Sequence, residues 1–195
     1  MHCLAESKKI IIVGIPGVGK TTLVTKIVET LTSNHKTVKV VSFGSVMLDE
    51  ATKRGLKDRD ELRKLPMSEQ QNLQKTAAES IAKLSEDFVI VDTHAFISTS
   101  SGYYPGLPAH VLTAIKPSNF ISVYAKPEDI YNRRLKDETR NRDNISIDGI
   151  KKELLFHQSM ISACSVFSGS PVKAVQNAEG KVDEAAKKVI DAIGL

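Results

Sequence analysis

A stretch early in the chain has the residue types and spacing of a loop that binds phosphate groups. The segment Gly14–Thr21 reads Gly-Ile-Pro-Gly-Val-Gly-Lys-Thr and matches the pattern G-x-x-x-x-G-K-[ST]. Glycines let the backbone wrap a polyphosphate with its N–H groups pointing inward. In this pattern Lys20 reaches the β- and γ-phosphate oxygens, and the Thr21 hydroxyl binds Mg²⁺. We therefore predict an ATP-binding loop made of Gly14, Ile15, Pro16, Gly17, Val18, Gly19, Lys20, Thr21 and Thr22.

The same glycines are also compatible with a plain turn between a strand and a helix. An apolar, β-branched run at 8–13 precedes the loop, and apolar residues at helical spacing follow it through 22–31. A buried strand, a glycine loop and a helix form the context in which this pattern binds phosphate. Both flanks therefore favour the ATP-binding interpretation.

Asp92 is the second candidate site residue, because it follows the apolar run Phe88–Val91. A carboxylate at the end of a buried strand holds Mg²⁺ in many proteins with a phosphate loop. An aspartate here can instead cap the segment that follows, but a phosphate loop needs a metal partner. We predict that Thr21 and Asp92 bind Mg²⁺. For His94 two interpretations remain open, a contact to phosphate or substrate and an ordinary loop histidine.

A cluster of basic residues lies between 133 and 142. Transfer of a phosphoryl group between two nucleotides requires several guanidinium groups to neutralise the phosphates. We predict this role for Arg133, Arg140 and Arg142, with Arg133 and Arg140 on one face of a helix that continues through Arg140. Ion pairs between residues four apart explain part of the cluster, and we expect Arg134, paired with Glu138, to be exposed and tolerant of substitution.

A second basic stretch, 53–64, follows the second predicted strand. It could hold a second substrate through Arg54, Arg59 and Arg63. The acidic residues between these arginines make ordinary surface ion pairs an equally good interpretation.

Strands and helices alternate along the chain. The predicted strands are 8–13, 38–43, 88–92, 120–124 and 172–175. The predicted helices are 22–31, 45–54, 59–65, 68–84, 108–116, 127–140, 147–167 and 182–193, with a loop at 93–108. This alternation predicts an α/β fold, a five-stranded parallel sheet of the P-loop NTPase type with helices on both faces. Ligands of such sheets bind beyond the carboxyl ends of the strands.

Composition sets the remaining limits. A chain of 195 residues with 41% hydrophobic residues predicts a single domain, 1–195, with a full core. The net charge of +4 suits phosphate ligands as well as nucleic acid. The chain has neither a membrane-length apolar run nor the apolar core of a signal peptide, and two cysteines are too few for a disulfide framework. We expect a cytoplasmic protein without a membrane partner.

The chain resembles the archaeal-type adenylate kinases. The matching segments are Gly14–Thr22, Arg59–Leu65, Val91–His94, Gly102–Pro108 and Arg133–Asp143, in the family's order over nearly the whole chain. The resemblance implies Mg²⁺-dependent transfer between ATP and AMP that gives two ADP, with Lys20 on the ATP phosphates. It also implies that Arg133, Arg140 and Arg142 act from a closing lid at about 133–147. The family is commonly trimeric, so a homotrimer is implied.

The sequence departs from the bacterial adenylate kinases at the AMP site. Those enzymes carry an arginine shortly after the second strand and another after the third, and neither Gly44–Leu48 nor Asp92–Phe96 contains one. The long lid of those enzymes is also absent. We therefore expect Arg54, Arg59 and Arg63 to bind AMP within a helical region at about 45–85.

A GTPase is disfavoured because the Asp-x-x-Gly and Asn-Lys-x-Asp patterns are missing. Two other alternative functions remain. Another small-molecule or nucleoside monophosphate kinase would use the same loop, Asp92 and arginines. A nucleotide-sensing or RNA-associated protein, suggested by the basic pI near 9.0, would bind ATP without turnover; we consider nucleic acid the less favoured partner.

Overall fold

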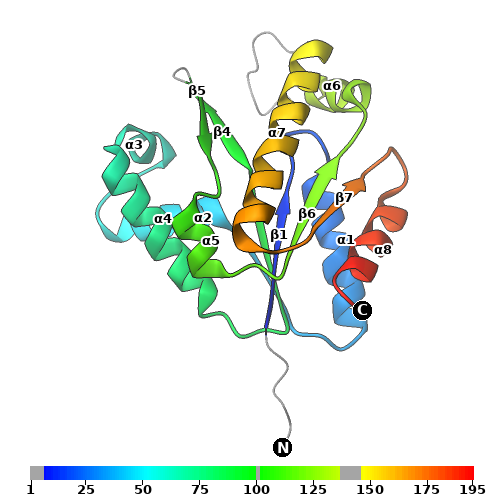
Figure 1. Ribbon diagram of the computed structural model, residues 1–195, viewed down its shortest axis with the longest axis horizontal. Helices are drawn as coiled ribbons and strands as arrows, with labels where there is room; N and C mark the ends of the chain where they lie inside the picture. The colour runs from blue at the N-terminus through cyan, green and yellow to red at the C-terminus, as the bar shows by residue number, and fades with distance from the viewer. Residues whose placement is uncertain (1–6, 100–101, 137–145) are drawn as a thin grey trace, which may run out of the picture.

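The computed structural model describes residues 7–99, 102–136 and 146–195, without the side chains of Arg59, Asp60 and Arg63. Its centre is a five-stranded parallel sheet in the order β2-β3-β1-β6-β7 (Figure 1). These strands are β1 (Lys8–Val13), β2 (Val38–Ser42), β3 (Phe88–Thr93), β6 (Asn119–Tyr124) and β7 (Val172–Gln176). The predicted α/β fold and its five-stranded parallel sheet are therefore confirmed.

Helices cover both faces of the sheet. They are α1 (Lys20–Ser33), α2 (Phe43–Lys53), α3 (Arg59–Lys64), α4 (Met67–Ala82), α5 (Ala109–Ile115), α6 (Pro127–Leu135), α7 (Ile147–Ser168) and α8 (Val182–Ala192). Figure 1 shows α1 and α8 together on one side of the sheet, and α4, α5 and α7 on the other. No helix among the described residues is both long and apolar enough to span a membrane.

The core lies on both faces of the central strands. In β1, Ile10–Val13 are buried, and in the neighbouring β3, Phe88–Val91 are buried. A parallel strand covered by helices on both faces must be apolar at successive positions, which is why these strands appear as continuous runs in the sequence. Because β3 and β6 pair with the two edges of β1, the carboxyl ends of all three strands meet beside the residues that follow β1.

Two local predictions were wrong. The segment predicted as a loop at 93–108 contains an antiparallel hairpin, β4 (Phe96–Thr99) and β5 (Gly102–Pro105). Its Phe96 and Tyr103 rings pack against Phe156 of α7, with centroids 5.1 and 4.3 Å from the Phe156 ring. Helix α6 ends at Leu135 and therefore does not reach Arg140.

Candidate active site

The phosphate loop connects β1 to the first turn of α1. Gly17 and Gly19 have φ angles of 91° and 82°, which L side chains rarely adopt, and Gly19 is the residue that precedes α1. A Cβ atom at Gly14 would lie 2.7 Å from the carbonyl oxygen of Val123 in β6. The glycines of the pattern are therefore required by both backbone conformation and close packing.

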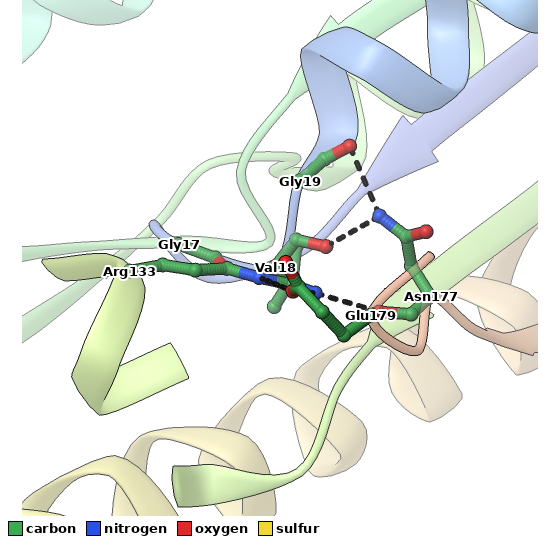
Figure 2. Close-up of polar contacts among 6 residues, drawn as sticks. All are labelled: Gly17, Val18, Gly19, Arg133, Asn177 and Glu179. Carbon is green, nitrogen blue, oxygen red and sulfur yellow. Dashed lines mark hydrogen bonds and ion pairs between the residues drawn. The ribbon is translucent and has the colours of Figure 1, made fainter. Parts of the chain in front are cut away.

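Side chains from two other elements bind the carbonyl groups of this loop. Arg134 of α6 donates from Nε to the Pro16 oxygen at 2.9 Å, and neighbouring Arg133 donates to the Gly17 oxygen at 3.4 Å. Asn177, which follows β7, donates from Nδ2 to the oxygens of Val18 and Gly19 at 2.9 and 3.3 Å. Figure 2 shows Arg133 and Asn177 beside the carbonyl groups of Gly17, Val18 and Gly19.

Lys20 and Asp92 lie together at the carboxyl edge of the sheet. Asp92 is opposite Ile12 in the β1–β3 register, so it faces the end of the strand that leads into the loop. The Lys20 Nζ atom is 3.0 Å from the Gly14 oxygen and 3.9 Å from Asp92 Oδ1. Burial raises the pKa of Asp92 above its usual value, and the charge of Lys20 opposes that rise.

The arrangement of Thr21 and Asp92 suits Mg²⁺. Both residues line one cavity of about 760 Å³ beside α1, and Asp92 Oδ1 is buried without a hydrogen-bond partner. No group of three or more histidine, cysteine or acidic side chains that could enclose a metal ion exists within the described part of the chain. Magnesium commonly takes only one or two protein oxygens and completes its shell with water and phosphate oxygens, so these residues fit it.

A buried histidine that sequence reasoning missed lies near Lys20. His157 of α7 is 3% exposed, and its Nε2 atom is 3.0 Å from Ser122 Oγ in β6. Burial, with a smaller contribution from the charge of Lys20, lowers the pKa of His157 to about 4. The imidazole is therefore neutral at neutral pH. No motif surrounds His157 in the sequence, so no signal pointed to it.

The prediction that Arg134 is exposed was wrong. Its side chain is 6% exposed and forms an ion pair with Glu153 of α7 at 2.6 Å, in addition to its bond to Pro16. Arg133 forms an ion pair of 2.9 Å with Glu179, which is exposed. Arg140 and Arg142 lie outside the described residues. The predicted role of Arg133, Arg140 and Arg142 at the phosphoryl group stays a prediction.

The remaining predicted residues belong to other elements of the chain. Arg54 follows α2, is exposed and lies 3.4 Å from Thr76 Oγ1 of α4. Arg59 and Arg63 belong to α3, and the positions of their side chains are outside the described part of the structure. His94 is exposed between β3 and β4. The AMP-binding role of the arginines and the role of His94 stay predictions.

Comparison with known proteins places the chain in a family. Residues 13–151 match the model of an AAA domain. The adenylate kinase of Methanocaldococcus jannaschii is 40% identical over 96% of this chain and 99% of its own length, and that of Thermoplasma acidophilum is 43% identical over 95% and 98%.

Solved structures confirm the fold alone, because their sequence identities are low. The shikimate kinase of Bacteroides thetaiotaomicron superposes with a TM-score of 0.55 at 13% identity, covering 96% of this chain and 99% of that one. The shikimate kinase of Aquifex aeolicus gives 0.55 at 15%, covering 95% of each. The near-complete match to curated archaeal sequences confirms the resemblance described above: the chain belongs to the adenylate kinases of the archaeal type.

Proposed function

We propose that this chain transfers the γ-phosphoryl group of ATP to AMP, reversibly and with Mg²⁺, to give two molecules of ADP, and so balances the adenine nucleotides. The observation that carries the proposal is the placement of Lys20, Thr21 and Asp92 around the phosphate loop of a chain from this family. No side chain needs to form a covalent intermediate, because phosphoryl transfer depends mainly on positioning and on neutralising charge.

Each residue has a defined role in this proposal. The loop N–H groups and Lys20 bind the β- and γ-phosphates of ATP. Thr21 and Asp92 hold Mg²⁺, which neutralises negative charge on the phosphate oxygens. Arg133, Arg140 and Arg142 stabilise the transferred phosphoryl group. They belong to a lid at about 133–147, which runs from the last residues of α6 to the start of α7.

The acceptor site is proposed for the helical region at about 45–85. Helices α2, α3 and α4 make up this region. Helix α2 begins directly after β2, whose last residue, Ser42, is opposite Asp92 in the β2–β3 register. Arg54 is exposed at the end of α2, and Arg59 and Arg63 belong to α3. These three arginines are the candidates for the AMP phosphate, because arginine binds phosphate with two parallel hydrogen bonds.

The decisive experiment incubates the protein with ATP, Mg²⁺ and a panel of nucleoside monophosphates, and measures ADP. We expect AMP to give the fastest turnover. A different preferred acceptor would identify another nucleoside monophosphate kinase or small-molecule kinase. Binding of ATP without turnover of any acceptor would favour the nucleotide-sensing alternative.

We further propose a homotrimer in the cytoplasm, as the archaeal-type resemblance implies. Light scattering coupled to size-exclusion chromatography measures the mass of the assembly. A monomeric mass would overturn this part of the proposal without affecting the proposed reaction.

A further inference from the structure

We propose that Asn177, together with Arg133 and Arg134, positions the phosphate loop for ATP by holding its carbonyl groups. The inference rests on the proposed function only in taking ATP as the ligand. It assigns Asn177 as a positioning residue, since its side chain contacts the loop and not the reacting atoms.

The contacts cover successive peptide groups. The carbonyl groups of Pro16, Gly17, Val18 and Gly19 each accept a hydrogen bond from a side chain: Arg134 binds the first, Arg133 the second, and Asn177 the last two. The two arginines belong to the helix that follows β6, and Asn177 follows β7. In the strand order, β6 and β7 lie on one side of β1, and β3, which carries Asp92, lies on the other. The loop backbone is therefore held from one side along its length.

The orientation of the N–H groups follows from that of the carbonyl groups. In a trans peptide the carbonyl and the N–H of the next residue point in opposite directions, and the described chain has no cis bond. Holding the carbonyl groups of residues 16, 18 and 19 thus directs the N–H groups of Gly17, Gly19 and Lys20 away from Arg134 and Asn177. The N–H of Val18 instead closes a turn onto the Ile15 oxygen, 3.4 Å away.

Charge and burial strengthen this arrangement. The guanidinium groups lie on the negative ends of the peptide dipoles, and a hydrogen-bonded carbonyl makes the N–H of its peptide a stronger donor. Glu153 and Glu179 hold the two arginines in place. Such support by surrounding groups preorganises a binding site before the ligand arrives.

Asn177 is itself fixed from several directions. It is 5% exposed, and its N–H donates to the Tyr124 oxygen at 2.8 Å. Its own carbonyl accepts from Arg133 at 3.3 Å. A Cβ atom at Gly19 would collide with the Asn177 amide, so the two groups are in close contact. Asn177 therefore has no freedom to leave the loop without a local rearrangement.

Two variants test this role, Asn177→Ala and Asn177→Asp. The aspartate keeps the size and shape of the side chain but removes both amide donors, so it separates hydrogen bonding from packing. We expect both variants to weaken ATP binding by about 10- to 100-fold, by analogy with the loss of residues that orient the ligands of a metal ion. The KM for ATP rises in parallel, and the KM for AMP is unchanged.

Asn119→Ala is the matched control. Asn119 also donates from its amide to a backbone oxygen, that of Ala192 at 3.4 Å, but it lies at the amino end of β6, away from the loop. We expect its ATP affinity to equal that of the wild type. Thermal unfolding without nucleotide, measured for all variants, identifies any variant that fails to fold.

ATP affinity measured by calorimetry tests this inference independently of the proposed phosphoryl transfer. Normal ATP affinity in folded Asn177→Ala and Asn177→Asp would overturn the inference, even if the wild type converts ATP and AMP to ADP. An equal rise in the KM values for ATP and AMP would overturn it as well. Weakened ATP binding in both variants would support it, even if the acceptor proved not to be AMP.

Discussion

Arg134 and Glu153 form an ion pair of 2.6 Å that joins the last turn of α6 to the first part of α7. The arginine is almost fully buried, whereas the carboxylate keeps some contact with water. Since Arg134 also binds the Pro16 carbonyl, the pair connects both helices to the phosphate loop. A buried pair of this kind costs desolvation energy to form, but removing one partner leaves an uncompensated charge.

We expect Arg134→Ala to lower the free energy of unfolding by about 3 kcal/mol, at the lower end for buried ion pairs because Glu153 is partly exposed. Urea unfolding measures the change. The double variant Arg134→Met, Glu153→Leu removes both charges and should lose less stability than Arg134→Ala alone. A loss as small as that of Lys151→Ala, which removes an exposed lysine, would contradict the structural role of the pair.

Replacing Lys20 with alanine should abolish phosphoryl transfer, with a loss in kcat of at least about 10³-fold, because its charge is needed at the β- and γ-phosphates. Helical content, measured by circular dichroism, should stay the same because Lys20 begins α1 and is not part of the core. Turnover near that of the wild type would overturn the proposed kinase mechanism.

Replacing Asp92 with asparagine should lower the activity without lowering the stability of the fold. The pKa of Asp92 in the folded chain is raised above its value of 3.8 in the unfolded chain, so at pH 7 the ionised carboxylate destabilises the fold. The neutral amide removes that cost, and we expect the nucleotide-free variant to melt no lower than the wild type. Its Mg²⁺-dependent turnover should fall sharply. A lower melting temperature together with normal turnover would contradict both assignments.

His157 should make the fold sensitive to acid. Its pKa is about 4 when folded and 6.5 when unfolded, so the unfolded chain binds the extra proton between these values. Stability is fully present above about pH 6.5 and is lost as the pH falls toward 4, by about 3 kcal/mol. Urea unfolding of the wild type and His157→Gln across this range isolates the contribution. Parallel stability curves for the two proteins would refute it.

Alanine at Arg140 or Arg142 should lower kcat by about 10²–10³-fold, with little change in ATP affinity, because interactions made only in the transition state affect kcat. Lys151→Ala is a better control than Arg134→Ala, since Lys151 is exposed on α7 and pairs with nearby Asp148 on the same helix. If all three variants behaved alike, the catalytic arginines would have to be sought at Arg54, Arg59 and Arg63.

The parts of the fold that the sequence predicted are those with strong local patterns. Buried parallel strands such as Phe88–Val91 are continuous apolar runs, and the phosphate loop carries its own spacing rule. The β4–β5 hairpin was missed because most of its residues are exposed, including Ile97 and Tyr104, so no alternation of apolar and polar residues marks it.

The environment of the phosphate loop could not be predicted, because its partners are distant in the sequence. Spacing suggested Glu138 as the partner of Arg134, whereas the structure provides Glu153 from the next helix. Nothing around Asn177 distinguishes it from an ordinary turn residue after a strand. Its importance depends on the order of strands in the sheet, which places the end of β7 beside the loop.

The separation between the loop and its partners also bears on how the chain folds. Gly17 and Arg133 are 116 residues apart, and Val18 and Asn177 are 159 apart. Contacts between such distant residues form late, because a long stretch of chain must first be ordered. During synthesis the ribosome delivers the phosphate loop long before Asn177. We expect a nascent chain to bind ATP tightly only after β7 has joined the sheet, so that nucleotide retention marks the completion of folding.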